Sequence, residues 1–289
     1  MKILVLGGTG SIGGAVVQVL QDRNHEVFAL GRTAEACKLL QQAGATPVKG
    51  DLKDPAHWID TCDDVDGIVH AAAVWGDQMG SVDRQTVEAI LSRLQSGGKP
   101  KAFVYTGGCW MYGETGDLVA TEDTPFNPLA SFAWAVPTIQ SVLTATDIRG
   151  MVIHPAMVYE RDGGVFERVF EDAKNLGYVR VVGSENVRWP LVHRLDLAQA
   201  YALMLEQGEH GDVYNIATNH GVSIGALTRA IANRLGIESD PVLYDTKKAM
   251  TEIGSWAEGY ALDQQMSGAK ARSVLGWRPK YEDVFTEIS

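Results

Sequence analysis

A glycine-rich segment close to the N-terminus constrains the fold of this chain more than any other feature. It reads Gly7-Gly8-Thr9-Gly10-Ser11-Ile12-Gly13-Gly14 and satisfies both G-x-G-x-x-G and G-x-x-G-x-x-G. A short apolar run at residues 2–6 precedes it, and a stretch of helical period over residues 11–22 follows it. Strand, glycine loop and helix in this order predict a dinucleotide-binding loop. The alternative is a glycine cluster that only makes a turn.

Glycine suits such a loop for three physical reasons. The turn demands positive φ, a Cβ would block the pyrophosphate, and the helix has to lie close to the strand. The backbone amides at the helix start then face the phosphates. The residues that we assign to this role are Gly7, Gly10, Ser11, Ile12 and Gly13.

The sequence beyond the loop alternates short apolar runs with longer stretches of helical period, which is typical of a parallel sheet covered by helices. The predicted strands are residues 2–6, 26–30, 46–49, 67–70, 101–106 and 150–154. The predicted helices between them are residues 11–22, 34–43, 82–95 and 132–145. Residues 159–190 show no clear alternation, and the pattern then resumes with a helix at 195–206, a strand at 212–217 and a helix at 223–235.

These elements predict an α/β fold, a Rossmann doubly wound parallel sheet with a small C-terminal substrate lobe. We expect residues 1–158 to form the dinucleotide-binding domain, with residues 191–218 returning to it. Residues 159–190 and 219–289 would form the small substrate-binding lobe. The cleft between the two opens at the carboxyl ends of the strands, where such sheets bind ligands.

Charge and cysteine content exclude several kinds of partner. The 36 acidic residues outnumber the 25 basic ones without any Lys/Arg-rich run, so neither nucleic acid nor a membrane surface is an expected partner. The three cysteines show no C-x-x-C pairing, which gives no support to a disulfide framework or a metal site. No apolar run reaches the roughly 18 residues of a membrane span, and the N-terminal one is too short for a signal peptide. We therefore expect a cytoplasmic protein with a small-molecule substrate, and the sequence leaves a homodimer open.

The end of the second predicted strand bears on which dinucleotide is bound. An acid at this place favours NAD(H) because it hydrogen-bonds the ribose hydroxyls. Here Gly31-Arg32-Thr33 follows the strand, and the next acid is Glu35, within the following helix. Arg32 can instead make a bidentate contact with a 2′-phosphate, so we predict NADP(H) in preference to NAD(H). The alternative is that Arg32 is a solvated residue at a helix start.

Further motifs occur in a fixed order along the chain. They are Gly50-Asp51-Leu52, His70-Ala71-Ala72-Ala73, Val104-Tyr105-Thr106, Tyr112-Gly113, His154-Pro155-Ala156-Met157-Val158-Tyr159, Val192-His193, Asp196-Leu197-Ala198 and Leu275-Gly276-Trp277-Arg278-Pro279. With the glycine loop, this series resembles the extended short-chain dehydrogenase/reductases, the group of sugar-nucleotide epimerases and dehydratases. One departure is His154, where the family more often has an arginine.

The resemblance implies roles for several residues at the predicted cleft. Asp51 and Leu52 would border the adenine, small alanines after the fourth strand would let the middle of the cofactor pass close to the backbone, and Thr106 would face the nicotinamide end. The alternative for Asp51 is a helix cap for the segment from Pro55 onward. The cofactor residues implied in this way are Asp51, Leu52, Ala71, Ala72, Ala73 and Thr106.

The proton-transfer residues of the family are missing. In the family a Tyr-x-x-x-Lys pair follows the fifth strand, and a serine before it holds the substrate oxygen. The best register places Phe132 on the tyrosine, Val136 on the lysine and Gly108 on the serine, and residues 127–147 contain neither tyrosine nor lysine. Replacement acids or bases predicted to line the cleft are Tyr112, His154 and Tyr159. A histidine is the natural acid or base near neutral pH, and the alternative is that His154 only ends a strand.

Aromatic residues gather on segments that border the cleft in this fold. We predict a substrate pocket formed by Trp75, Cys109, Trp110 and Trp134, which favours an apolar or aromatic substrate over a sugar diphosphate. The alternatives are core aromatics and a buried thiol. The sequence thus predicts an NADP(H)-dependent oxidoreductase that transfers hydride to or from a small carbonyl or imine-like compound. An epimerase, dehydratase or isomerase with a bound cofactor, and a non-catalytic NADP(H) sensor, remain open.

Overall fold

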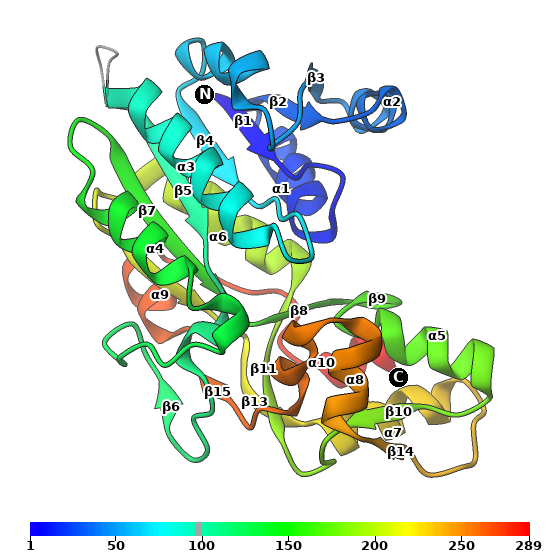
Figure 1. Ribbon diagram of the computed structural model, residues 1–289. Helices are drawn as coiled ribbons and strands as arrows, with labels where there is room; N and C mark the ends of the chain where they lie inside the picture. Colours follow the sequence, from blue (N-terminus) through cyan, green and yellow to red (C-terminus); the bar gives the residue numbers. More distant parts are fainter. Residues whose placement is uncertain (96–99) are drawn as a thin grey trace.

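A computed structural model describes residues 1–95 and 100–289 of the chain (Figure 1). Its main sheet has seven strands, all parallel, in the order β12-β7-β5-β4-β1-β2-β3. The strands are β1 (Lys2–Leu6), β2 (Glu26–Gly31), β3 (Thr46–Lys49), β4 (Gly67–His70), β5 (Ala102–Thr106), β7 (Arg149–Pro155) and β12 (Val213–Ile216). The chain builds outward from β1 to β3 and then crosses back to β4, so the order reverses between β1 and β4. Doubly wound sheets bind their ligands at such a point.

The central strands are apolar along their whole length because both faces of the sheet are covered. In β1, Ile3 and Val5 belong to one buried cluster, whereas Leu4 and Leu6 belong to the other. The first face is covered by α1 (Ser11–Asp22), α2 (Ala34–Gln42) and α6 (Arg194–Gln207). The second face is covered by α3 (Met79–Gln95), α4 (Ala135–Thr144) and the 3₁₀ turns η1 (Pro55–His57) and η2 (Ile59–Asp63).

Local sequence explains where two of these helices begin. The Thr33 hydroxyl accepts from the Ala36 N–H at 3.1 Å and thereby caps α2. The predicted helix at 132–145 begins only at Ala135, after a separate 3₁₀ turn, η4 (Ala130–Phe132). Pro137 falls in the first turn of α4, where backbone N–H groups have no partner within the helix, so its missing donor costs little.

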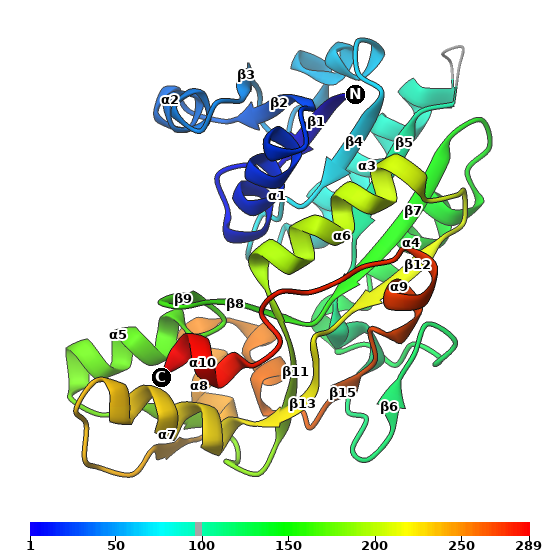
Figure 2. The same cartoon turned by 180° about the vertical axis from the view of Figure 1, so that it is seen from behind.

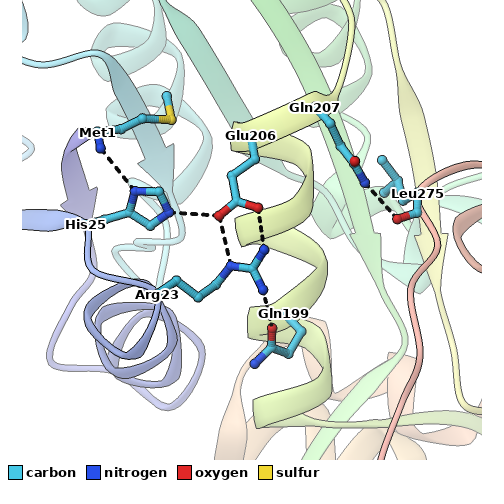
Figure 3. Close-up of polar contacts among 7 residues, drawn as sticks. All are labelled: Met1, Arg23, His25, Gln199, Glu206, Gln207 and Leu275. Carbon is cyan, nitrogen blue, oxygen red and sulfur yellow. Dashed lines mark hydrogen bonds and ion pairs between the residues drawn. The ribbon is translucent and has the colours of Figure 1, made fainter.

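Helices α1 and α6 lie side by side on one face of the sheet, the face turned toward the viewer in Figure 2. Glu206 of α6 joins them at one end, since its carboxylate accepts from Arg23 Nε at 2.8 Å and from His25 Nε2 at 2.9 Å (Figure 3). Arg23 also donates to Gln199 Oε1 at 3.3 Å, and the Met1 amino group donates to His25 Nδ1 at 3.2 Å. The hydrogen bonds from Arg23 lower the pKa of Glu206, so this junction stays charged.

Apart from the short helix Ala269–Val274, which contacts β12 of the main sheet, the remaining elements form a second, smaller body below that sheet (Figure 1). Its four-stranded sheet has the order β13-β11-β8-β9, and two further strand pairs, β10 with β14 and β6 with β15, flank it. The strands are β6 (Val119–Ala120), β8 (Met157–Glu160), β9 (Gly163–Gly164), β10 (Arg180–Val182), β11 (Arg188–His193), β13 (Asn219–Ser223), β14 (Val242–Tyr244) and β15 (Gln265–Met266). The helical segments outside the main sheet's faces are η3 (Cys109–Tyr112), α5 (Glu167–Leu176), α7 (Ile224–Arg234), α8 (Thr246–Ile253), η5 (Ser255–Ala261), α9 (Ala269–Val274) and α10 (Val284–Ile288).

The predicted doubly wound α/β fold is confirmed, and the first strand, first helix, third strand and fourth strand have their predicted bounds. Two expectations need correction. Residues 159–190 do contain regular structure, including α5, whose apolar residues Val169, Phe170, Ala173 and Leu176 recur at a helical spacing that was not recognised in the sequence. β11 pairs with β8 and β13 in the smaller sheet, so residues 191–193 lie outside the main sheet and the chain rejoins that sheet only at β12. In the described part of the chain, no helix is both long and apolar enough to cross a membrane.

Candidate functional site

The glycine loop lies between β1 and α1, at the point where the strand order reverses. Gly7 has φ +93°, and a Cβ there would lie 2.6 Å from the Ala71 carbonyl oxygen of the loop after β4. A Cβ on Gly13 would lie 2.1 Å from the Gly7 carbonyl oxygen, so α1 sits too close to the strand for any side chain. Gly10 differs, because a Cβ there would have just one neighbour within 4 Å among the described residues, the Gly7 carbonyl oxygen at 3.4 Å. The space over Gly10 is therefore open toward a ligand, whereas the other two glycines are required by the fold.

The start of α1 is suited to an anion. Gly10 precedes the helix with no side-chain cap, and its first turn contains no acidic residue. Ser11 and Ile12 follow as the first helical residues, and helix N-termini present backbone N–H groups and a partial positive charge. The Ser11 hydroxyl donates to Glu160 Oε1 at 3.2 Å, a contact that the sequence did not predict.

The predicted adenine end lies at the tips of β2 and β3. Arg32 is exposed and makes no hydrogen bond or ion pair with any other part of residues 1–95 and 100–289. Asp51 Oδ1 accepts from the Lys53 N–H at 3.0 Å, and Asp54 holds the N-cap position of η1. The alternative role of Asp51 as cap of that turn is therefore wrong. The Leu52 carbonyl accepts from Thr86 at 3.1 Å, which ties this loop to α3.

The alanines after β4 and the threonine after β5 line the edge between the two ends of the cleft. The Ala71 N–H donates to the Leu6 carbonyl at 3.0 Å, Ala72 is half-buried and Ala73 is exposed. Thr106 lies at the end of β5 as predicted, but its hydroxyl is 2.6 Å from the hydroxyl of Tyr201 on α6. The structure therefore pairs the Thr106 hydroxyl with a buried tyrosine on the α1/α6 face of the sheet.

The three predicted acid or base residues are all buried. The Tyr112 hydroxyl donates to Asn215 Oδ1 at 2.7 Å, and burial raises the pKa of Tyr112. His154 Nδ1 accepts a backbone N–H of the loop after β5 at 3.2 Å, and burial lowers the pKa of His154 to about 4. Burial also raises the pKa of Tyr159, whose hydroxyl donates to the Tyr281 carbonyl at 3.5 Å. Near neutral pH all three side chains are uncharged and packed inside the protein.

Aromatic rings meet around Phe132, the residue that the sequence register predicts in place of the family's tyrosine. We call this group the aromatic cluster: Trp75, Trp110, Phe132, Trp256 and Tyr260. Phe132, in the register of the family tyrosine, has its ring centroid 5.2 Å from that of Trp110. The ring centroids of Trp75 and Trp256 are 4.8 Å apart, and this contact joins the main body to η5 of the C-terminal segment. The Trp110 Nε1 is buried and has no hydrogen-bond partner among the described residues.

Two members of the predicted substrate pocket lie apart from the aromatic cluster. Trp134 packs over Gly80 of α3 and donates its indole N–H to the Ser131 carbonyl at 2.8 Å. Cys109 is buried, and burial raises the pKa of its thiol to about 12, so it is a packing residue. The described residues hold no group of three or more His, Cys, Asp or Glu side chains arranged to bind a metal.

Sequence reasoning missed four residues at this site. Trp256 and Tyr260 come from a segment without a family motif, and their spacing of four in the 3₁₀ turn η5 is not a same-face spacing, so no local signal in the sequence marks them. Glu160 and Arg194 form an ion pair at 3.1 Å beside the start of α1. Both directly follow motifs at strand ends, which is the place where this fold collects functional side chains.

The reversed strand order, the glycine loop and the anion-suited helix start together define a Rossmann protein of the dinucleotide-binding class. The sequence model of the NAD dependent epimerase/dehydratase family matches residues 3–217. The chain therefore belongs to that family, and the predicted resemblance is confirmed.

Relatives and solved structures match nearly the whole chain. An uncharacterized protein of Saccharomyces cerevisiae is 28% identical over 298 residues, which cover 100% of this chain and 98% of the relative. A dTDP-glucose 4,6-dehydratase from Bacillus anthracis in complex with NAD has a TM-score of 0.81 at 19% identity, covering 99% of this chain and 94% of that one. The structure of a human epimerase family protein with NADPH has a TM-score of 0.80 at 19% identity, and the match covers 99% of this chain and 97% of the human one. These two structures share the fold and were solved with different nicotinamide cofactors.

Proposed function

We propose that this protein is an NADP(H)-dependent oxidoreductase that acts on a small planar, apolar carbonyl or imine-like compound without the Tyr-x-x-x-Lys pair of its family. The observation that carries the proposal is the aromatic cluster. Phe132 takes the place of the tyrosine and rests on Trp110, so rings stand where proton-transfer groups would otherwise be. A surface of this kind binds a flat apolar molecule and offers little to a sugar diphosphate.

The residues present fit a dinucleotide cofactor. The open space over Gly10 and the uncapped start of α1 would take the pyrophosphate, and Asp51 and Leu52 would border the adenine. Arg32 has no other partner among the described residues and is well suited to a 2′-phosphate, which favours NADP(H) over NAD(H). When bound, the cofactor supplies or accepts a hydride.

The Trp110 indole N–H and the lack of a tyrosine–lysine pair restrict the kind of substrate that the aromatic cluster would accept. The Trp110 indole N–H has no partner among the described residues, and a buried donor of this kind gains when a ligand brings an acceptor atom. No tyrosine–lysine pair is present to provide a proton, and the three titratable candidates are buried and neutral. A substrate that needs no proton from the protein is favoured for this reason. An imine that is already protonated in solution meets this requirement, because it becomes an amine by accepting hydride alone.

The experiment is a measurement of nicotinamide absorbance with NADPH and a panel of cyclic imines and aldehydes. We expect turnover with planar aromatic members and little with aliphatic ones of similar size. Trp110→Phe keeps the ring and removes only the N–H, so KM should rise by about five- to tenfold for substrates with an acceptor atom. Absence of any substrate-dependent change in absorbance would exclude the oxidoreductase proposal.

A second candidate is a non-catalytic NADP(H)-binding protein. The observation in its favour is that Tyr112, His154 and Tyr159 are all buried while the cofactor loop is intact. Such a protein would bind NADPH and gain thermal stability without turnover. Net conversion of a substrate with no change in nicotinamide absorbance would instead indicate the epimerase, dehydratase or isomerase class.

A further inference from the structure

The carboxylate of Glu160 lies beside the start of α1, where the proposed cofactor's phosphates would bind. It belongs to the last residue of β8, in the smaller sheet, yet its Oε1 accepts from the Ser11 hydroxyl at 3.2 Å. Its other oxygen, Oε2, is 3.1 Å from Arg194 Nε. The contact therefore spans the smaller sheet and the cofactor-binding loop.

Several features make this position favourable for negative charge. Ser11 is the first residue of α1 and Arg194 is the first residue of α6, so the N-termini of two neighbouring helices converge on the same carboxylate. Each helix start carries a partial positive charge, and the Arg194 guanidinium adds a full one. The side chains of Arg194 and Glu160 are only 29% and 31% exposed, so solvent screens the pair incompletely.

We infer that Glu160 is an internal substitute for the cofactor's phosphates, holding Ser11 and Arg194 in the free protein and giving way when the dinucleotide binds. Arg194 then becomes a phosphate ligand in place of its bond to Glu160. The inference rests on the proposed NADP(H) binding and extends it, because it names the residues that set affinity at the phosphate end. A pyrophosphate and a carboxylate are both anionic and compete for the same donors.

The competition has a definite sign. Glu160 lowers cofactor affinity in two ways, since its bonds to Ser11 and Arg194 have to break and its charge repels the incoming phosphates. Removing the charge should strengthen binding, whereas removing Arg194 should weaken it. A purely structural role of the ion pair predicts instead that both changes weaken binding or leave it unaltered.

The test is calorimetric titration of NADPH into the full-length protein and its variants. Glu160→Gln keeps the size of the side chain, and we expect about fivefold tighter binding. Arg194→Gln should bind about tenfold more weakly. Glu171→Gln removes an exposed carboxylate of α5 in the same body and should leave affinity unchanged.

Thermal denaturation provides a second readout. Without cofactor, the Glu160→Gln protein should have a slightly lower Tm than the unmodified protein, because it loses an ion pair. Saturation with NADPH should raise the Tm of Glu160→Gln by more than it raises the Tm of the unmodified protein. Equal or weaker NADPH binding by Glu160→Gln would overturn the inference and leave the proposed function standing. Absence of dinucleotide binding by both proteins would overturn the proposed function and the inference together.

Discussion

Two regions at the carboxyl edge of the main sheet, the glycine loop and the aromatic cluster, differ in which family features they contain. At the phosphate end, Gly7 and Gly13 hold the strand and helix at a separation that allows no side chain, and Gly10 leaves space for a ligand. At the other end, the chemical end, Phe132 and Val136 stand where the sequence register predicts the family's tyrosine and lysine. Both ends lie at the carboxyl edge of the same sheet, so the difference separates cofactor binding from the chemistry performed with it.

The physical reason is that the phosphate end consists of backbone and the chemical end of side chains. A Cβ at Gly13 would clash with a carbonyl oxygen at 2.1 Å, so a substitution there damages the fold itself. Phe132 is half-buried and packs against the Trp110 ring and the edge of a buried cluster, so a change of side chain there meets no backbone clash. A glycine loop is thus retained for folding as well as for binding, whereas catalytic side chains are free to change.

The largest effect is expected at the phosphate end. Gly10→Val should abolish dinucleotide binding in a calorimetric titration while the protein stays folded, because the only atom near the new Cβ is 3.4 Å away. Gly13→Ala should instead lower the free energy of unfolding by about 1–3 kcal/mol, because of its clash. Gly14→Ala is the matched control, since its Cβ would make ordinary contact at 3.5 Å. If Gly10→Val retained its affinity for the dinucleotide, the assignment of cofactor binding to the glycine loop would be wrong.

A second prediction concerns acid stability at the chemical end. The pKa of His154 is about 4 in the folded protein, below the roughly 6.5 of an unfolded chain, so the unfolded state binds the extra proton. The contribution of His154 is complete above about pH 6.5 and is lost as the pH falls toward 4, by roughly 3 kcal/mol at most. Denaturant unfolding of His154→Gln should show a smaller loss over this interval. His57→Gln, at an exposed histidine, should behave like the unmodified protein.

The third prediction bears on the cofactor's 2′-phosphate. Arg32→Ala should weaken NADP(H) binding by about 1.5–3 kcal/mol, the size of a charge-assisted hydrogen bond, and should spare NAD(H). The side chain is exposed and without a partner among the described residues, so the fold should be unaffected. Parallel titrations with both cofactors measure the difference. Equal losses for the two would mean that Arg32 does not read the 2′-phosphate.

The smallest effect is expected where the catalytic pair is missing. Phe132→Tyr adds one hydroxyl to a half-buried ring and should change the free energy of unfolding by about 0.5 kcal/mol or less. Combined with Val136→Lys, it should leave turnover unimproved or impaired, because the new ammonium enters an apolar cluster. A substantial rise in carbonyl reduction by the double variant would show that the cleft still supports the family's chemistry.

The main sheet could be predicted from the sequence because its strands and helices have clear periods. β1 and α1 have their predicted bounds, and the boundary between them is set by the glycine loop. α5 was missed although its apolar residues Val169, Phe170, Ala173 and Leu176 recur at helical spacing. The period is short, charged residues lie between these positions, and glycines stand on both sides of the segment, so the local pattern predicts irregular structure.

The candidate site was predicted less completely, for a related reason. Motifs at strand ends locate the edge of the sheet, but they do not say whether a side chain turns toward the cleft or into the core. Tyr112 and Tyr159 belong to such motifs, and both side chains are buried. Trp256 lies more than 140 positions from Trp110 along the chain, so only the folded structure brings their rings together.

The contact between Trp75 and Trp256 also gives this protein a spectroscopic signal of its own. Two indole rings with centroids 4.8 Å apart and planes tilted by 45° couple their electronic transitions, and such coupling produces a paired band in circular dichroism. The signal depends steeply on separation, so a flat molecule that inserts between the rings should abolish the band before any chemistry takes place. Substrates could therefore be sought by light alone, and Trp256→Phe, which removes one partner of the pair, would supply the blank.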